Sequence, residues 1–542
     1  MYLPFISDIQ EIKEENSILS FVSLGTEHYP FLSHHAFNKQ IIIPAVVFLE
    51  IFAENAKRLF PELSIYHIEK AEFNSFLSMR QDESVDVFCS LQVDKSQVIE
   101  GQLYHYFENK LANVKRKKII ATMRANLSKH PVKSSNKQDI PFFPFSDTVI
   151  DKRDIYPDLV GLGKSFNHLS SVLQMSSDHG AIGKLIRNSI DLNIDINSLI
   201  LGNLLLRDSS YHLASIWGNH FIGGFNVPFA MYDIYIHDRM EDNEYFSVIK
   251  PLGKDGVGQS YSLFIIDLSG RIIEEYQKIL YTHNVTVSEN TNREAIEQRK
   301  QNIIELKHLS HELYKDLDYA GIWSTAFVKQ NEREFLVYLN HEEIVIYEKY
   351  TRQSSRLEYL GARVLVKLLL IKAIKDKYHR DISFNDISIL RDNNGLAILL
   401  IRGKTYDNIS ISLSHKKDYV FVALQFNSKL GVDVEELSEK LIRVSSKYID
   451  DSEMLLLREA FPGHHRHNPS LEAYAMLWSS KESLVKALNG RYPLLEIGRT
   501  AKLYSVNDNT LKLKCQLDNT DITVQTKSFP YQNHIFTWLT KP

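Results

Sequence analysis

Acidic and apolar residues alternate in the stretch from Gly431 to Glu435, which reads GVDVE. If this stretch is a β-strand, successive side chains point to opposite faces, so Asp433 and Glu435 share one face while the valines point into a core. Two carboxylates held that close repel each other, and the repulsion raises their pKa values unless a cation with oxygen ligands lies between them. The pattern predicts a site for a hard divalent cation such as Mg2+.

A second segment, from Trp478 to Lys486 (WSSKESLVK), follows further along the chain. On a helix, Trp478, Glu482 and Lys486 are spaced i, i+4, i+8 and lie on one face. Glu482 can therefore join Asp433 and Glu435 in a cluster of three carboxylates, and a bound Mg2+ would complete its shell with phosphate oxygens or water. Taken singly, the two segments are better explained as a solvated edge strand and a surface helix with an i, i+4 ion pair.

In this order and at this spacing, the two segments resemble the paired signature of the 4'-phosphopantetheinyl transferases, G-[VI]-D-x-E followed by W-[ST]-x-K-E-[SA]-x-x-K. The segment from Ile411 to His415 (ISLSH) is similar to the element whose histidine contacts a phosphate of coenzyme A in that family. The resemblance implies phosphoryl transfer, in which a serine of an acyl carrier protein attacks the pyrophosphate of coenzyme A.

The resemblance also implies roles for particular residues. Mg2+ is expected on Asp433, Glu435 and Glu482. Glu482 or a bound water is expected to take the proton of the attacking serine, and Lys481 is expected to offset charge on the phosphate oxygens. The residues expected to hold coenzyme A are His415, Lys416, Lys486 and Arg363. Apolar residues at helical spacing predict a helix over residues 356–372, on which Arg363 is equally well explained as an exposed arginine.

In the N-terminal half, Pro44 and the apolar residues after it predict a helix from Ala45 to Phe60. Strand-like segments follow at residues 83–93, 102–107 and 118–127, and they indicate a helix wrapped by a sheet. A second helix is predicted from Leu204 to Trp217, where Asp208 and His212 are spaced i, i+4. The sequence therefore predicts two units in tandem, each with one helix wrapped by a sheet.

The motifs of this half resemble those of the dehydratases of polyketide synthases, which have a double hot-dog fold. Pro30, Phe31, Leu32, His35 and Pro44 match the first motif, P-F-L-x-D-H-x-x-x-G-x-x-x-x-P, and Asp208 with His212 matches D-x-x-x-[QH]. This sequence has His34, Lys39 and Leu162 where the family has aspartate, glycine and tyrosine.

The resemblance implies that His35 and Asp208 remove water from a 3-hydroxyacyl chain. His35, whose ordinary pKa is about 6.5, can be neutral and accept the α-proton. Asp208 must instead donate a proton to the departing hydroxyl, which requires an apolar tunnel that disfavours its charged form. A role restricted to acyl binding is the alternative for this half, and a carrier-docking scaffold without catalysis is the alternative for the whole chain.

The length of 542 residues predicts more than one domain. Residues 288–302 are polar and charged, with almost no large apolar side chains, and this composition is typical of a linker. We therefore expect a dehydratase-like double hot-dog over residues 1–285, a polar linker over 286–305, and a transferase over 306–542. The expected fold class is α+β, with two subdomains in the transferase.

Composition narrows the possible partners. With 63 basic and 67 acidic residues, the chain has no excess of positive charge that would indicate nucleic-acid binding. The run from Lys115 to Lys118 is either a solvated turn that keeps a sheet edge soluble or a docking patch for an acidic carrier protein. The two cysteines, Cys89 and Cys515, fit neither a disulfide framework nor a zinc site. Without a signal-like N-terminus or a long apolar run, we expect a cytoplasmic protein with no membrane insertion, and the oligomeric state stays open.

Overall fold

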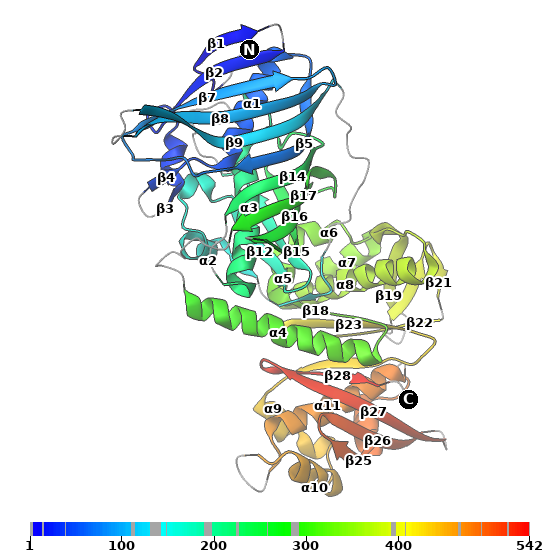
Figure 1. Cartoon of the computed structure of the whole chain (residues 1–542). Helices are drawn as coiled ribbons and strands as arrows, with labels where there is room; N and C mark the ends of the chain where they lie inside the picture. The colour runs from blue at the N-terminus through cyan, green and yellow to red at the C-terminus, as the bar shows by residue number, and fades with distance from the viewer. Residues whose placement is uncertain are drawn as a thin grey trace. The chain divides into compact units, whose positions relative to one another are not determined.

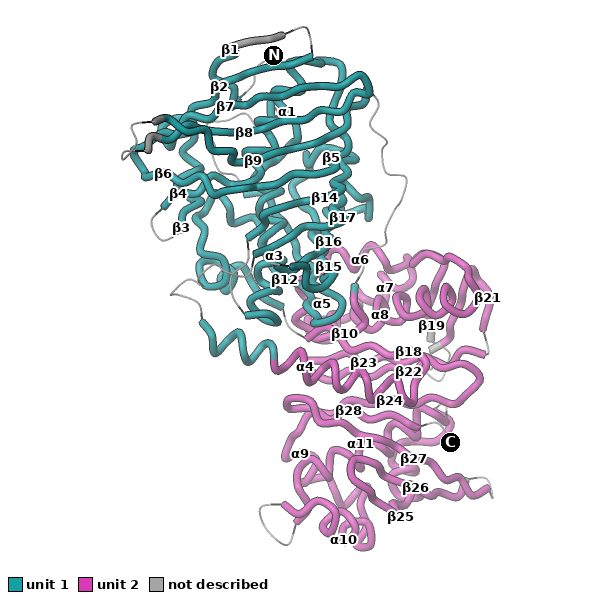
Figure 2. Tube along the Cα trace, in the orientation of Figure 1, with its two compact units in different colours: residues 1–142, 149–300 teal, residues 143–148, 301–542 magenta. Residues whose placement is uncertain are grey.

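The structure is a computed structural model. It describes residues 4–540 except 14–15, 38–39, 110–113, 130–141, 148, 189–197, 224–226, 257, 283–291, 392–396, 407, 464–467, 489 and 518–519. The chain divides into two compact units, which are coloured separately in Figure 2: unit 1 comprises residues 1–142 and 149–300, and unit 2 comprises residues 143–148 and 301–542. None of the described helices is long and apolar enough to cross a membrane.

Unit 1 is built on one antiparallel sheet of thirteen strands, in the order β1-β2-β7-β8-β9-β5-β14-β17-β16-β15-β13-β12-β11 (Figure 1). The strands of its first half are β1 (Asp8–Lys13), β2 (Ser17–Gly25), β5 (Ser64–Phe73), β7 (Ser84–Val93), β8 (Val98–Asn109) and β9 (Val114–Ser128). Those of its second half are β11 (Ile150–Asp151), β12 (Leu169–Ser176), β13 (Gly180–Ile186), β14 (Pro228–Ile236), β15 (Glu244–Asp255), β16 (Gly258–Asp267) and β17 (Ile272–Thr282). Pairing of β5 with β14 joins the two halves.

Each half of unit 1 wraps its sheet around one helix. Helix α1 (Ala45–Leu59) packs against β2, β5 and β7, and helix α3 (Leu204–Phe221) packs against β12, β13 and β15. Pro44 precedes α1, whose residues 46–56 are all buried, and the Asn203 side chain caps α3 by accepting hydrogen bonds from the first-turn amides. The predicted helices and strands are confirmed, as is the double hot-dog. A small sheet of β3 (Ala36–Phe37), β4 (Gln40–Ile42) and β6 (Ser78–Met79) lies beside them.

Unit 2 contains two principal sheets, and the predicted α+β class is confirmed. One has the order β10-β18-β23-β22, with β10 (Phe145–Ser146), β18 (Tyr319–Ser324), β22 (Ile409–Lys416) and β23 (Tyr419–Phe426). The other has the order β24-β28-β27-β26-β25, with β24 (Val432–Glu436), β25 (Lys502–Asn507), β26 (Thr510–Leu517), β27 (Thr520–Tyr531) and β28 (His534–Leu539). A third, small sheet comprises β19 (Ile387–Arg391), β20 (Ala397–Ile401) and β21 (Lys404–Thr405).

Helices cover both principal sheets of unit 2. Helix α8 (Gln353–Tyr378) packs on β18, β22 and β23, and helix α11 (Leu471–Ala487) packs on β24, β27 and β28. One buried core, which includes Leu309, Phe421, Val432 and Trp538, contains side chains from both sheets. The remaining helices are α4 (Arg293–Asp316), α5 (Thr325–Gln330), α6 (Glu332–Leu336), α7 (His341–Lys349), α9 (Glu439–Arg443), α10 (Asp451–Ala460) and α12 (Leu494–Thr500).

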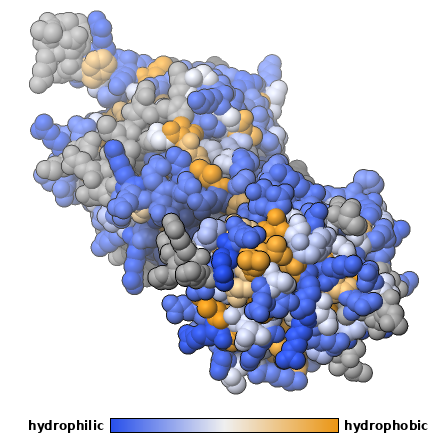
Figure 3. Space-filling view, turned by 90° about the horizontal axis from the view of Figure 1, so that it is seen from below, coloured by the Kyte–Doolittle hydropathy of each residue, from blue (hydrophilic) through white to orange (hydrophobic). Residues whose placement is uncertain are grey.

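Two features were not expected from the sequence. Part of the proposed linker is helical, because α4 begins at Arg293 and buries Ile296, Ile303, Leu306 and Leu309 along its length. The segment 143–148 belongs to unit 2, where β10 pairs in parallel with β18. Where the surface is seen from below, it is mostly hydrophilic, with apolar side chains gathered in a few patches (Figure 3).

Candidate active sites

Three carboxylates of unit 2 converge between β24 and α11. Asp433, Glu435 and Glu482 each offer a carboxylate oxygen, and these oxygens all lie within 4.8 Å of one another. Asp433 and Glu435 are 1% and 5% exposed, so β24 is not a solvated edge strand. Val432 and Val434 point to the opposite face of β24 and are buried as well, as the alternation in the sequence predicts. Both faces of β24 are therefore covered.

The carboxylates differ in how their charge is balanced. Burial, reinforced by the neighbouring Asp433 carboxylate, raises the pKa of Glu482 to about 8 and also raises the pKa of Glu435. Asp433 accepts hydrogen bonds from the hydroxyl of Ser414 at 2.8 Å and from that of Ser479 at 2.7 Å. These two donors fix the orientation of the Asp433 carboxylate.

Two lysines flank the cluster. The Lys486 ammonium donates to Asp433 at 2.7 Å, and the Lys416 ammonium forms an ion pair with Glu435 at 2.8 Å. Three carboxylates are thus offset by two cations, and the oxygen donors they offer fit a hard divalent ion. Both lysines that were expected to hold coenzyme A therefore contact carboxylates of the cluster.

His415 belongs to β22 and Arg363 to α8, the helix that packs on that strand. His415 precedes the last residue of β22 and pairs with Glu358 of α8 at 3.1 Å, and its side chain is 41% exposed. Arg363 is only 2% exposed, with its guanidinium 4.7 Å from the centre of the Tyr359 ring and its Nε without a hydrogen-bond partner among the residues that the structure describes. The alternative of an exposed helix arginine is wrong, and the unpaired donor is available for an anion.

The structure corrects the prediction for Lys481. Its side chain is 1% exposed and pairs with Glu453 of α10 at 2.8 Å, and its ammonium also donates to the backbone carbonyls of Tyr448 and Gly498. Lys481 immediately precedes Glu482 on α11, so its side chain points about 100° away from that of Glu482 around the helix axis. Its role is to tie α11 to α10, and it does not face the carboxylate cluster.

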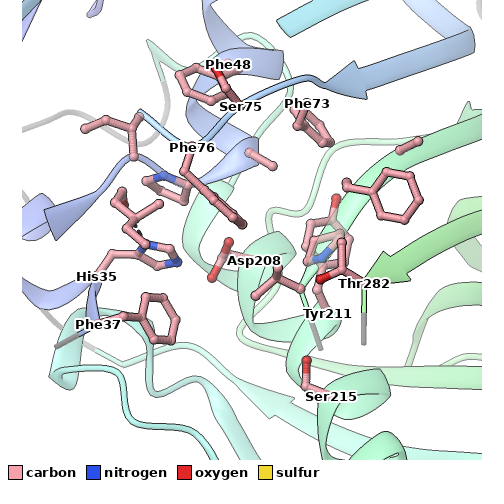
Figure 4. A pocket seen from close by; sticks show the side chains of 18 of the residues that line it. His35, Phe37, Phe48, Phe73, Ser75, Phe76, Asp208, Tyr211, Ser215 and Thr282 are labelled. Atoms are coloured by element: carbon pink, nitrogen blue, oxygen red, sulfur yellow. Dashed lines mark hydrogen bonds between the residues drawn. The ribbon is translucent and has the colours of Figure 1, made fainter. Parts of the chain in front are cut away.

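Unit 1 contains an apolar cavity of about 480 Å³ that holds the second predicted site. His35, from the end of the Pro30–His34 turn, and Asp208, from α3, both line it and face each other in Figure 4. Most of its wall is apolar, with Phe37, Phe48, Phe73, Phe76 and Leu162 among the lining residues. Lys39 lies outside the described residues.

The surroundings of His35 favour its neutral form. Its Nδ1 lies 2.6 Å from the carbonyl oxygen of Ile42, which can only accept, so Nδ1 carries the proton and Nε2 is the acceptor. The ring packs 4.9 Å from that of Phe166. Burial lowers the pKa of His35, and the Asp208 carboxylate offsets part of that effect.

Asp208 belongs to a buried chain of hydrogen bonds. Its Oδ2 lies 3.2 Å from Nε2 of His212, and Nδ1 of His212 lies 2.9 Å from the hydroxyl of Tyr156. Sequence analysis missed Tyr156, because only the fold brings it to α3. Leu162, at the family's tyrosine position, lines the cavity, and Tyr156 supplies a hydroxyl to the same group of side chains.

His34, which stands where the family motif has aspartate, is not among the residues that line this cavity. Its Nδ1 lies 2.6 Å from the hydroxyl of Ser165, and burial lowers its pKa. A Cβ added to Gly163 would lie 2.8 Å from the His34 side chain, so the close approach of these two segments needs glycine. The pairing holds the loop that carries Leu162 against the turn that carries His35.

Comparison with known proteins finds similar proteins for both halves of the chain. A family model for the polyketide synthase dehydratase domain matches residues 9–106. The holo-[acyl-carrier-protein] synthase of Geobacillus sp. (strain WCH70) is 33% identical over 90 residues, which are 17% of this chain and 74% of that protein. The 4'-phosphopantetheinyl transferase gsp of Aneurinibacillus migulanus is 27% identical over 143 residues, which are 25% of this chain and 54% of that protein. The dehydratase domain from the CurF module of curacin polyketide synthase superposes with a TM-score of 0.46 at 14% identity, over 52% of this chain and 100% of that domain.

The matches define a two-part chain, in which a hot-dog domain resembling the polyketide synthase dehydratases is fused to a transferase. The chain belongs to the family of the phosphopantetheinyl transferases and holo-acyl-carrier-protein synthases.

Proposed function

We propose that the C-terminal half transfers 4'-phosphopantetheine from coenzyme A to a serine of an acyl carrier protein or carrier domain. The serine oxygen forms a bond to the phosphorus that carries pantetheine, the pyrophosphate bond breaks, and adenosine 3',5'-bisphosphate leaves. The observation that carries this proposal is the convergence of Asp433, Glu435 and Glu482 within 4.8 Å, between Lys416 and Lys486.

The three carboxylates would hold Mg2+, which, when bound, offsets the charge on the pyrophosphate oxygens. Ser414 and Ser479 keep Asp433 oriented toward the cluster. Glu482 or a bound water would take the proton of the carrier serine. The unpaired Nε of Arg363 and the exposed ring of His415 are suited to bind phosphate oxygens of coenzyme A.

For the N-terminal half we propose dehydration of a 3-hydroxyacyl chain that is carried as a thioester on the phosphopantetheine arm. Nε2 of His35 takes the α-proton, and Asp208 gives a proton to the hydroxyl, which leaves as water. The geometry that supports this is the placement of both groups in one largely apolar cavity, with Nδ1 of His35 fixed by Ile42. The pathway would be of the polyketide or fatty-acid type.

The two activities are tested separately. For the first, the protein is incubated with coenzyme A, Mg2+ and apo-carrier proteins, and the carriers are weighed by mass spectrometry. Gain of one phosphopantetheine is expected, and a failure with every carrier favours a docking scaffold. For the second, carriers loaded with 3-hydroxyacyl chains should lose one water with the parental protein but not with His35→Ala or Asp208→Asn. Equal loss of water in both variants would contradict the assignment, and none with the parental protein favours a role in acyl binding.

A further inference from the structure

A cationic surface borders the mouth of the unit 1 cavity. Lys115, Arg116, Lys117 and Lys118 follow one another at the start of β9, and all four are exposed. The chain as a whole has a net charge of −4, so this run is a local feature rather than the general character of the surface. Exposed aromatic residues lie opposite it on β8, where Tyr106 pairs with Lys117 and Phe107 pairs with Arg116.

Strand geometry divides the run between two faces of the sheet. Ile120 is fully buried, so its side chain points into the unit, and Arg116 and Lys118 project from the same face because side chains alternate along a strand. Lys115 and Lys117 project from the other face, where the Lys117 ammonium lies 3.9 Å from the centre of the Tyr104 ring. Residues opposite each other in an antiparallel pair share a face, so Phe107, 40% exposed, lies with Arg116.

The face that carries Arg116 and Lys118 continues to the cavity. The carbonyl oxygen of Ile120 accepts a hydrogen bond from the amide of Asn74 at 2.7 Å, so the segment after β5 lies against this part of β9. Asn74, Ser75 and Phe76 all line the cavity, and Phe76 is 58% exposed, which places it at the opening. Figure 4 shows Ser75 and Phe76 on the same side of the cavity as Phe48 and Phe73.

We propose that Arg116, Lys118 and Phe107 form a docking surface for the phosphopantetheine-bearing face of an acyl carrier protein. The proposal rests on the dehydratase function proposed above. A carrier modified at a serine has a phosphodiester at the point where the arm leaves the protein, and this anion matches the charge of Arg116 and Lys118. Phe107 adds an exposed apolar contact beside them. A carrier docked here presents its arm at the edge of the cavity, so that the acyl chain enters toward His35 and Asp208.

The test compares two substrates that carry the same 3-hydroxyacyl chain, one on the holo-carrier and one on free pantetheine, which lacks both the carrier and the phosphate. In the double variant Arg116→Glu/Lys118→Glu, KM for the carrier-linked substrate is expected to rise on the order of tenfold, with less rise at high salt, because charge complementarity governs encounter. Turnover of the pantetheine thioester should not change. Lys115→Glu is the matched control on the same strand and opposite face, and it should leave both substrates unaffected.

The outcomes separate this proposal from the proposed function. If parental protein dehydrates neither substrate, the dehydratase function fails, and the surface is then tested by binding alone, with fluorescently labelled holo-carrier titrated against the His35→Ala protein. Weaker binding of the holo-carrier by the double variant, with Lys115→Glu as before, supports the surface. Equal effects of Arg116→Glu/Lys118→Glu and Lys115→Glu, or no effect of either on the carrier-linked substrate, overturn it. Circular dichroism melting of each variant verifies that unit 1 is folded.

Discussion

Tyr156→Phe removes one hydroxyl from the chain that links Tyr156, His212 and Asp208. When Asp208 is ionised, His212 donates from Nε2 to Asp208 and accepts at Nδ1 from the Tyr156 hydroxyl. When Asp208 carries the proton it must donate, that proton lies on its other carboxyl oxygen, because Oδ2 still accepts from Nε2 of His212 and Nδ1 still accepts from the tyrosine. The tyrosine hydroxyl therefore keeps His212 satisfied in either state.

Phenylalanine cannot donate, so His212 is left with a buried ring nitrogen that has no partner. His212 and Tyr156 are 6% and 8% exposed, so water cannot readily replace the hydroxyl, and an unsatisfied buried group costs about 1–3 kcal/mol. At about 1.4 kcal/mol for each factor of ten, the expected fall in kcat is roughly 5- to 150-fold, with little change in KM because Tyr156 contacts His212 from behind and is not itself one of the residues that line the cavity.

The assay is dehydration of a carrier-bound 3-hydroxyacyl chain, followed by mass spectrometry across pH. Tyr261→Phe is the matched control, because Tyr261 is fully buried in the same unit and its hydroxyl has no hydrogen-bond partner in the described part of the chain. A nitrogen NMR spectrum of the His212 ring should also report a changed Nδ1 signal in Tyr156→Phe and an unchanged one in Tyr261→Phe. Parental kcat together with a parental His212 spectrum in Tyr156→Phe would refute the reasoning.

Three other predictions concern the remaining groups. Because burial lowers the pKa of His35 and the base acts only when neutral, kcat/KM for dehydration should stay on its plateau as the pH falls to 6.5 and decline only below it; a decline centred above pH 6.5 would contradict this. Lys481→Met leaves Glu453 buried without its cation and should destabilise unit 2 by about 3–5 kcal/mol in urea unfolding, with residual folded protein still active; loss of activity without loss of stability would restore a catalytic role. Asp147→Ala deprives the Tyr419 hydroxyl of its acceptor and leaves the Tyr531 hydroxyl only the carbonyl of Asn302, so it should lower the stability of unit 2 by about 1–3 kcal/mol, whereas an unchanged urea midpoint would show that segment 143–148 is dispensable.

The carboxylate cluster could be predicted because its signals are local. Alternation in GVDVE fixes which residues of β24 share a face, and helical spacing fixes that Glu482 and Lys486 lie on one side of α11. The misassigned Lys481 shows the limit of this approach. Its neighbour in sequence is a cluster residue, but its true partner, Glu453, is on another helix that no local pattern connects to it.

The features that were missed depend on contacts between distant segments. The two residues of β10 are too few to give a periodic signal, and their partner β18 follows only after the whole second hot-dog half. The sequence predicts a linker over the first part of α4, because the exposed face of this helix is highly charged and its apolar residues are widely spaced. Tyr156 was missed for the same reason as β10, since its hydroxyl meets His212 across more than fifty residues of chain.

The central claim, that the three carboxylates carry phosphopantetheine transfer, is tested most directly by the initial rate of carrier modification at saturating coenzyme A and Mg2+ for Asp433→Asn and Glu482→Gln. Each variant removes one charge from the cluster, and a loss of at least about 100-fold is expected, on the scale of losing one key electrostatic group in an active site. Glu472→Gln, an exposed substitution on the same helix, should match the parental rate. Near-parental turnover by Asp433→Asn or Glu482→Gln under these conditions would contradict the account.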